Sequence, residues 1–210
     1  MAWYIVLAVI ALAIVYIFYS YARIRKMGEG TSEMVEMAAI IRSGAGTFLK
    51  TEFRTIAIVV ILVAAVFSLF VEKTSGITFL MGACMSSVVC VLGMRSATYA
   101  NVRTANRARE TMSIGETVKV ALCGGSISGL SVQAFGMLGL VGVLLIFGGV
   151  SHEAAGKGLL GVDLGAINAS VMRVSTYSLG CSLVAMFNRV AGGNYTKAAD
   201  TSAPTAAPRV

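Results

Sequence analysis

The sequence of 210 residues is 57% hydrophobic and only 13% charged, and its mean hydropathy is +0.81. Because about a quarter of the residues in soluble domains are charged, this composition excludes an ordinary soluble domain and predicts an all-α polytopic membrane protein. The net charge of +7 does not indicate a nucleic-acid-binding protein, because the basic residues lie between apolar runs and not on one face interleaved with aromatic residues.

The first apolar run covers residues 2–21 and has basic residues only behind it, at Arg23, Arg25 and Lys26. A cleavable signal peptide carries its positive charge in front of the apolar run, so we predict an uncleaved span with its N-terminus outside. Residues 31–54 then predict an amphipathic helix on the cytoplasmic side, because they combine one apolar stripe with acidic residues in the first turn.

Three further apolar runs follow along the chain. The second span, at about residues 55–71, continues the amphipathic helix, and the third, at about 77–94, runs on into a polar stretch that ends at Thr111. The fourth run, residues 118–150, would be roughly 50 Å long as a helix, against a hydrocarbon core of about 30 Å. We therefore expect this helix to tilt strongly, to break, or to project beyond the bilayer.

Small residues interrupt the fourth run, among them Gly125, Gly129, Gly136 and Gly139. Small residues let transmembrane helices approach closely, so we predict that these positions form helix-packing faces. A fifth span, at about residues 159–188, returns the chain to the side of the amphipathic helix.

The distribution of lysine and arginine sets the predicted topology. Five spans with the N-terminus outside place 14 of the 17 basic residues on the cytoplasmic side, and the outside loops carry only Lys73 and Lys157. Because basic residues are enriched on the cytoplasmic side, this count favours a cytoplasmic C-terminus. We place the membrane part at residues 1–200 and predict a disordered tail at 201–210, which contains both prolines of the chain.

Arg173 is the one basic residue inside a predicted span. A charged residue within a span is a functional candidate by default. Here the predicted outer interface is near enough for the side chain to reach water, with Asp163 and Asn168 as polar partners, so we favour a structural role. The sequence contains no C-x-x-C pair, nucleotide-binding glycine loop or zinc-binding helix motif.

Candidate chemistry lies at the end of the fifth span. Arg189 closes the apolar run, and Gly192 and Gly193 follow it. Lys197 and Asp200 lie three residues apart, so on a helix they share one face. A cation and a carboxylate on one face can hold a phosphate oxyanion and a metal ion. The alternative is an ordinary helix end with a glycine break and a solvent-facing ion pair.

Two segments carry a resemblance to a known family. Residues 187–200 read FNRVAGGNYTKAAD, which resembles the segment F-x-R-V-G-G-G-I-[YF]-T-K-A-A-D of the membrane-bound, ion-translocating inorganic pyrophosphatases. Residues 93–109 read GMRSATYANVRTANRAR, which resembles the segment G-M-x-x-A-T-x-A-N-x-R-T of the same family, at the right distance upstream. The sequence is thus identified as the N-terminal part of such a pyrophosphatase.

The resemblance implies a pump of the cell (inner) membrane that couples hydrolysis of cytoplasmic pyrophosphate to outward transport of H⁺ or Na⁺, with Mg²⁺ as cofactor and a homodimer as assembly. Lys197 matches the lysine that contacts pyrophosphate, Asp200 the first metal-facing aspartate, and Arg189 the arginine at the top of the ion pathway. For Asn101 and Arg103 we assign only helix-end packing and orientation. The implied partners are pyrophosphate and the lipid bilayer.

The sequence also departs from the family pattern. Ala191 replaces the first of three glycines, Asn194 replaces an apolar residue, and Asn188 is polar just before the arginine. The match stops at Asp200, because Pro204 stands where the family has its next aspartate. Further metal-binding aspartates of this family come from later helices, as do the determinants of H⁺ or Na⁺ transport and of K⁺ dependence. We therefore expect the chain to be incomplete and inactive alone, with either ion open.

Two other functions stay open at this point. One is a non-catalytic membrane scaffold or subunit, whose proline-containing tail replaces the catalytic half. The other is a small anion transporter in which Arg173 and Arg189 contact the anion. A partner chain that supplies the missing catalytic helices is compatible with the pump.

Overall fold

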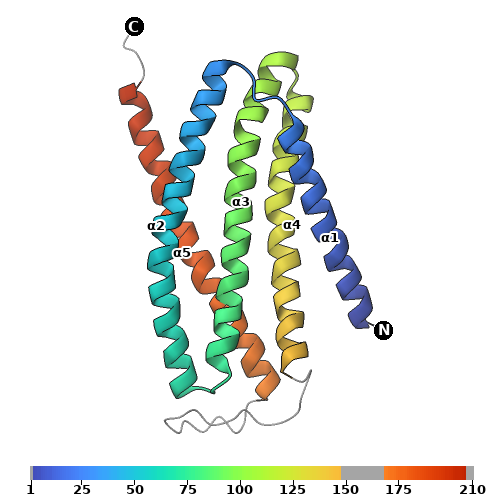
Figure 1. Ribbon diagram of the computed structural model, residues 1–210, viewed down its shortest axis with the longest axis vertical. Helices are drawn as coiled ribbons and strands as arrows, with labels where there is room; N and C mark the ends of the chain where they lie inside the picture. Colours follow the sequence, from blue (N-terminus) through green and yellow to red (C-terminus); the bar gives the residue numbers. More distant parts are fainter. Residues whose placement is uncertain (1, 148–167, 207–210) are drawn as a thin grey trace.

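The computed structural model describes residues 2–147 and 168–206, and within them the side chains of residues 4–147, 168–193 and 197. These residues form five helices (Figure 1), which confirms the all-α prediction. The helices are α1 (Ala2–Lys26), α2 (Ser32–Phe70), α3 (Ser75–Thr111), α4 (Ile114–Ile146) and α5 (Ala169–Ala206).

Helix α3 is the centre of the bundle and takes part in both of its apolar cores. One core joins α2, α3 and α5 and is built around Phe79 and Val184. The other joins α1, α3 and α4 and is built around Ile24 and Ile127. Figure 1 shows α2, α3 and α4 side by side in alternating directions, with α1 against α4 and α5 crossing the bundle obliquely.

The connections between the helices gather at two opposite ends of the bundle. One end holds the α1–α2 connection, the α3–α4 turn and the C-terminal end of α5, and the other holds the start of α1, the α2–α3 turn and the start of α5 (Figure 1). The first end therefore carries the arginine-rich segments that close α1 and α3, and is called the basic end below. This separation agrees with the predicted alternation of sides, and the assignment of the first end to the cytoplasm stays a prediction.

The helix lengths bear directly on the predicted spans. Four helices of the described part, α1 to α4, are long and apolar enough to cross a membrane. The predicted amphipathic segment and second span form one continuous helix of 39 residues, α2. The described part of the fourth run lies in one unbroken helix of 33 residues, α4, so a break is excluded between residues 118 and 146.

The fifth span stays a prediction, because residues 159–167 of it lie outside the described residues. The described part of α5 is less apolar than α1, α2 and α4, since it contains Arg173 and many serine, threonine and glycine residues. At its other end α5 continues to Ala206, six residues past the predicted start of the tail. None of the residues Thr201, Ser202 and Ala203 is a helix breaker, so the helix continues into a last helical turn that contains Pro204. Residues 207–210 of the predicted tail lie outside the described residues.

Glycines set the closest approach between helices, but mostly at other positions than those predicted. Of the four glycines expected to pack in α4, only Gly139 has no room for a side chain, because a Cβ there would meet the Tyr177 ring. A Cβ at Gly125, Gly129 or Gly136 would meet nothing within 4 Å, although the carbonyl oxygen of Gly136 accepts a hydrogen bond from the Tyr177 hydroxyl at 3.0 Å. The closest crossing joins α3 and α5, where Gly82 lies against the backbone of Tyr177 and Gly180 lies against the backbone of Phe79. The direction of α5 is therefore fixed near its middle.

Candidate functional site

Helix α5 places the three predicted site residues on one side of a single helix. At about 100° per residue, Lys197 lies roughly 80° and Asp200 roughly 20° around the helix axis from Arg189. Along the axis the two residues lie about 12 Å and about 16 Å beyond Arg189. The helix therefore aligns a cation and a carboxylate position at the basic end of the bundle, with a second cation about two to three turns nearer to the membrane part.

The side chains of Arg189 and Lys197 are both exposed. No ion pair or side-chain hydrogen bond joins Arg189 to another residue of the described part, so the acidic partner expected for an ion-pathway arginine does not come from residues 4–147 or 168–193. The side chain of Asp200 lies outside the described residues. Near its C-terminal end α5 leans away from α3 and α4 (Figure 1).

The two glycines between Arg189 and Lys197 do not interrupt the helix. α5 runs continuously through Gly192 and Gly193, and a Cβ on either residue would meet nothing within 4 Å. The interpretation of this segment as a helix end with a glycine break is therefore wrong. Flanking residues that favour a helix, such as Ala191, allow the glycines to be included at a cost of about 1 kcal/mol each.

Arg173 is held at the opposite end of the bundle. Its Nη2 atom lies 3.2 Å from Glu72 Oε1, its Nη1 donates to the carbonyl oxygen of Phe147 at 3.1 Å, and its guanidinium lies 5.3 Å from the centre of the Phe147 ring. Glu72 is only 5% exposed. This ion pair supports the structural role predicted for Arg173 and argues against the anion transporter, which required Arg173 as an anion contact. The expected partner Asp163 lies outside the described residues.

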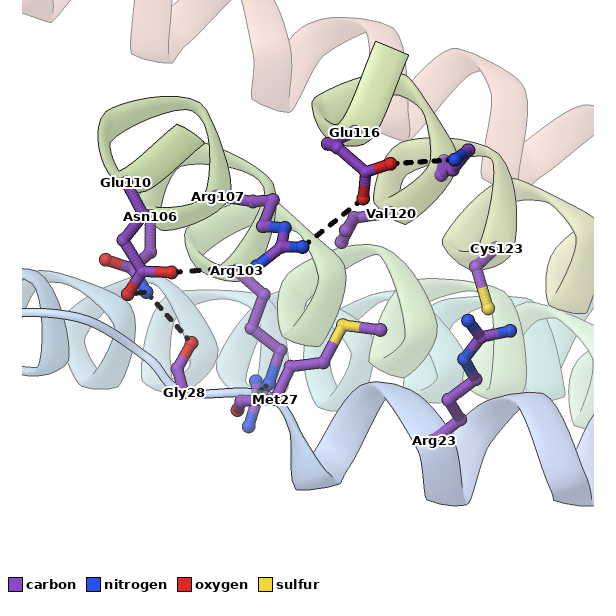
Figure 2. A pocket seen from close by; sticks show the side chains of 11 residues that line it. Arg23, Met27, Gly28, Arg103, Asn106, Arg107, Glu110, Glu116, Val120 and Cys123 are labelled. Atoms are coloured by element: carbon purple, nitrogen blue, oxygen red, sulfur yellow. Dashed lines mark hydrogen bonds and ion pairs between the residues drawn. The ribbon is translucent and has the colours of Figure 1, made fainter. Parts of the chain in front are cut away.

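A second ion-pair cluster lies at the basic end and fastens the α1–α2 connection to α3. The buried Arg103 lies beside Met27 (Figure 2) and donates to its carbonyl oxygen at 3.0 Å, and it pairs with Glu29 at 2.8 Å. Arg42 of α2 contacts the same Glu29 oxygen at 2.6 Å. The hydrogen bond from Arg42 and the charge of Arg103 hold the pKa of Glu29 below its ordinary value. Arg103 thus joins three helices, which agrees with the packing and orientation role expected for it.

Two further side chains complete this cluster. The guanidinium of Arg42 lies 4.4 Å from the centre of the Tyr99 ring, in the range of a cation–π contact. Asn106 donates to the carbonyl oxygen of Gly28 at 3.5 Å and leaves no room for a Cβ at Gly30, which has a φ of 96°. Sequence reasoning missed these contacts. The only available signal was that Tyr99 and Asn106 lie in the same family-like segment as Arg103.

The geometry therefore shows a helical membrane bundle whose two family-like segments both lie at its basic end. Residues 11–205 match the family model described as inorganic H⁺ pyrophosphatase. The chain belongs to this family. As a member of the pyrophosphatase family with four long apolar helices, it is a multi-pass membrane protein.

Curated relatives within this family are ion pumps by name. A K⁺-stimulated pyrophosphate-energized sodium pump of Thermotoga maritima is 46% identical over 186 residues, which cover 88% of this chain and 26% of the relative. A K⁺-insensitive pyrophosphate-energized proton pump 2 of Moorella thermoacetica is 33% identical over 193 residues, covering 91% of this chain and 26% of the relative. A K⁺-insensitive proton pump of Chloroflexus aurantiacus is 32% identical over 221 residues. The chain spans about a quarter of the length of these relatives.

The described residues of this family member show no cluster of protein metal ligands. They contain no group of three histidine, cysteine, aspartate or glutamate side chains that could hold a metal ion. Mg²⁺ is usually bound through one or two carboxylates together with substrate phosphates and water. A single carboxylate such as that of Asp200 would therefore need further ligands from outside the described residues.

Proposed function

We propose that this chain forms part of a pyrophosphate-energised pump that couples hydrolysis of cytoplasmic pyrophosphate to outward transport of H⁺ or Na⁺. The observation that carries the proposal is the match over residues 11–205, within which α5 aligns the family-like residues at the basic end of the bundle. Sodium pumps and proton pumps both occur among the relatives, so the proposal covers both ions.

In this proposal Lys197 contacts pyrophosphate, Asp200 faces Mg²⁺, and Arg189 lies on the ion pathway. A lysine ammonium is a compact positive charge that suits a phosphate oxygen. When bound, Mg²⁺ would neutralise charge on the diphosphate, which makes attack by water easier. Because the described residues supply no cluster of metal ligands, we expect the 210-residue chain alone not to hydrolyse pyrophosphate. By analogy with the family, we expect the complete pump to be a homodimer.

The proposal can be tested by transferring this chain into a relative. The matching 186 residues of the Thermotoga maritima pump are replaced by this chain, and membranes that contain the chimera are assayed for Mg²⁺-dependent pyrophosphate hydrolysis and for ion uptake into vesicles. We expect hydrolysis and transport in the chimera, and loss of both when Lys197 or Asp200 is changed to alanine. Membranes that carry the 210-residue chain alone are expected to show neither activity.

The matched control for Lys197→Ala is Lys73→Ala, which removes an exposed lysine from the opposite end of the bundle. This control should leave hydrolysis unchanged. A chimera that inserts into the membrane and does not hydrolyse pyrophosphate would contradict the proposal, as would full activity in the Lys197→Ala and Asp200→Ala chimeras.

A further inference from the structure

A cavity of about 300 Å³ opens at the basic end of the bundle, between α1, α3 and α4. Its volume lies at the lower limit of small-molecule sites, which range from about 300 to 1,000 Å³. Figure 2 shows side chains from all three helices around this space, with Arg23 reaching from α1 toward Cys123 of α4. None of the three predicted site residues lines it, so the cavity is separate from the proposed pyrophosphate contacts.

The charged groups around the cavity are predominantly basic. Four cations and two carboxylates line it, namely Arg23, Arg103, Arg107, Lys119, Glu110 and Glu116. Glu116 lies 3.2 Å from Arg107 and 2.7 Å from Lys119, so one carboxylate serves two cations (Figure 2). Glu110 lies 4.0 Å from Arg107. With four cations and two carboxylates, the lining carries an excess of positive charge.

Arg23 is the cation that remains available to a ligand. It is exposed, and no ion pair or side-chain hydrogen bond joins it to another residue of the described part. Arg103, in contrast, is occupied by Glu29 and by the backbone of the α1–α2 connection. An anion that entered the cavity would thus meet a guanidinium that no carboxylate of the described part neutralises.

The cavity lies at the level where the apolar helices become polar. Arg23 follows the apolar run of α1 by two residues, and on α4 the lining passes from Glu116 and Lys119 to Val120 and Cys123. One wall is therefore charged and faces the basic end, and the other is apolar and faces the membrane part. At such a boundary the guanidinium of Arg23 can reach the headgroup layer while the methylene groups of the same side chain stay in contact with apolar groups.

We propose that this cavity binds the phosphate group of an anionic phospholipid. Basic pockets between transmembrane helices on the cytoplasmic side suit such headgroups, because the negative charge of the lipid is confined to that layer. The guanidinium of Arg23 offers a planar fork of N–H donors to two phosphate oxygens, and Arg107 and Lys119 add positive charge from α3 and α4. The apolar wall at Val120 accommodates the glycerol end of the lipid.

The test is lipid binding by the 210-residue chain in a neutral detergent, measured by native mass spectrometry with phosphatidylglycerol and, in parallel, with phosphatidylcholine. We expect phosphatidylglycerol to bind and the net-neutral lipid to bind far more weakly. Arg23→Gln should weaken phosphatidylglycerol binding about five-fold, the factor that corresponds to about 1 kcal/mol for one basic residue near the membrane surface. Lys119→Gln should weaken it in the same direction.

Arg54→Gln is the matched control, since it removes the same charge from an exposed arginine of α2 that does not line the cavity. An equal loss in Arg23→Gln and Arg54→Gln would mean unspecific attraction and would overturn the proposal.

Inorganic phosphate and pyrophosphate are added as competitors at constant ionic strength. Displacement of the lipid by either anion at micromolar concentration would assign the cavity to a soluble phosphate and overturn the lipid assignment. Neither outcome depends on pyrophosphate hydrolysis, so the result is independent of the proposed pump.

Discussion

Arg173 of α5 and Glu72 of the α2–α3 turn form an ion pair of 3.2 Å across 101 residues of sequence. The hydroxyl group of Thr74 donates to the same carboxylate oxygen at 2.6 Å. The pair therefore joins the start of the last helix to a turn in the middle of the chain, at the end of the bundle opposite to the family-like segments. Because Glu72 is 5% exposed, these two partners replace the water contacts that its carboxyl group loses on burial.

We predict that Arg173→Gln lowers the stability of the helical bundle by about 3 kcal/mol, because removal of one partner leaves a buried charge unpaired. The measurement is the loss of helical structure in a denaturant titration of the purified chain in detergent. Lys73→Gln, a change of an exposed residue in the same turn, should have almost no effect. If Arg173→Gln and Lys73→Gln are equally stable, the pair does not hold α5 in place.

Arg103 should be the strongest determinant of order in the α1–α2 connection. Its guanidinium donates to backbone carbonyl groups of that connection and pairs with Glu29, and only 4% of its side chain is exposed. We predict that Arg103→Gln speeds amide hydrogen exchange in residues 25–31 by at least ten-fold, since a loss of about 1.4 kcal/mol gives that factor. Arg107→Gln, four residues along the same helix, should leave exchange there unchanged, because Arg107 pairs with Glu116. Equal protection in both variants would contradict the assignment.

Glu29 gives the same cluster a defined pH dependence. The hydrogen bond from Arg42 and the charge of Arg103 lower the pKa of its carboxyl group from 4.5. A carboxylate whose folded-state pKa is lowered stabilises the fold above its unfolded-state pKa and loses that contribution as the pH falls through the folded-state value. We predict that the difference in melting temperature between the original chain and Glu29→Gln is constant near neutral pH and shrinks below about pH 4.5. A difference that persists unchanged at pH 3 would exclude Glu29 as the titrating group.

The helices were predictable because their signal is local. Long apolar runs set α1 to α4, and an uninterrupted pattern correctly joined the amphipathic segment to the second span in α2. The ion pairs were not predictable in the same way. Nothing near Glu29 or Glu72 in the sequence indicates an arginine 74 or 101 residues away, because such pairs follow from the packing of the helices.

The contacts of the glycines were also only partly predictable from the sequence. A glycine within an apolar helix indicates a possible close approach, but the sequence does not say which face meets a neighbour. Gly125 and Gly129 therefore looked equivalent to Gly139, although only Gly139 contacts another helix. At the candidate site, the family resemblance predicts roles for Lys197 and Asp200, and the structure adds that the helix between Arg189 and these residues is continuous.

The glycine contacts lead to a prediction about the α3–α5 crossing. A Cβ at Gly82 or Gly180 would overlap backbone atoms of the facing helix, which cannot move aside as a flexible side chain can. We predict that Gly82→Ala and Gly180→Ala each destabilise the bundle by about 2 to 3 kcal/mol, as overpacking does. Gly125→Ala and Gly129→Ala face open space and should be neutral or stabilising by up to about 1 kcal/mol. The measurement is a denaturant titration of the four variants. If Gly125→Ala and Gly129→Ala are more destabilising than Gly82→Ala and Gly180→Ala, the closest approach of α3 and α5 does not lie at Gly82 and Gly180.

The last prediction concerns which end of the bundle faces the cytoplasm. Met112, 88% exposed and in the left-handed conformation at the α3–α4 turn, lies at the basic end, and Lys73 lies at the other end. In a background in which the four native cysteines are replaced by alanine, we introduce Met112→Cys or Lys73→Cys. Because the opposite orientation would move 14 of the 17 basic residues across the membrane, we expect the basic end to face the cytoplasm. A membrane-impermeant thiol reagent should then label Lys73→Cys in intact cells. It should label Met112→Cys only after the membrane is opened. The reverse pattern would place the basic end outside, on the side opposite to cytoplasmic pyrophosphate, and would contradict both the topology and the proposed coupling.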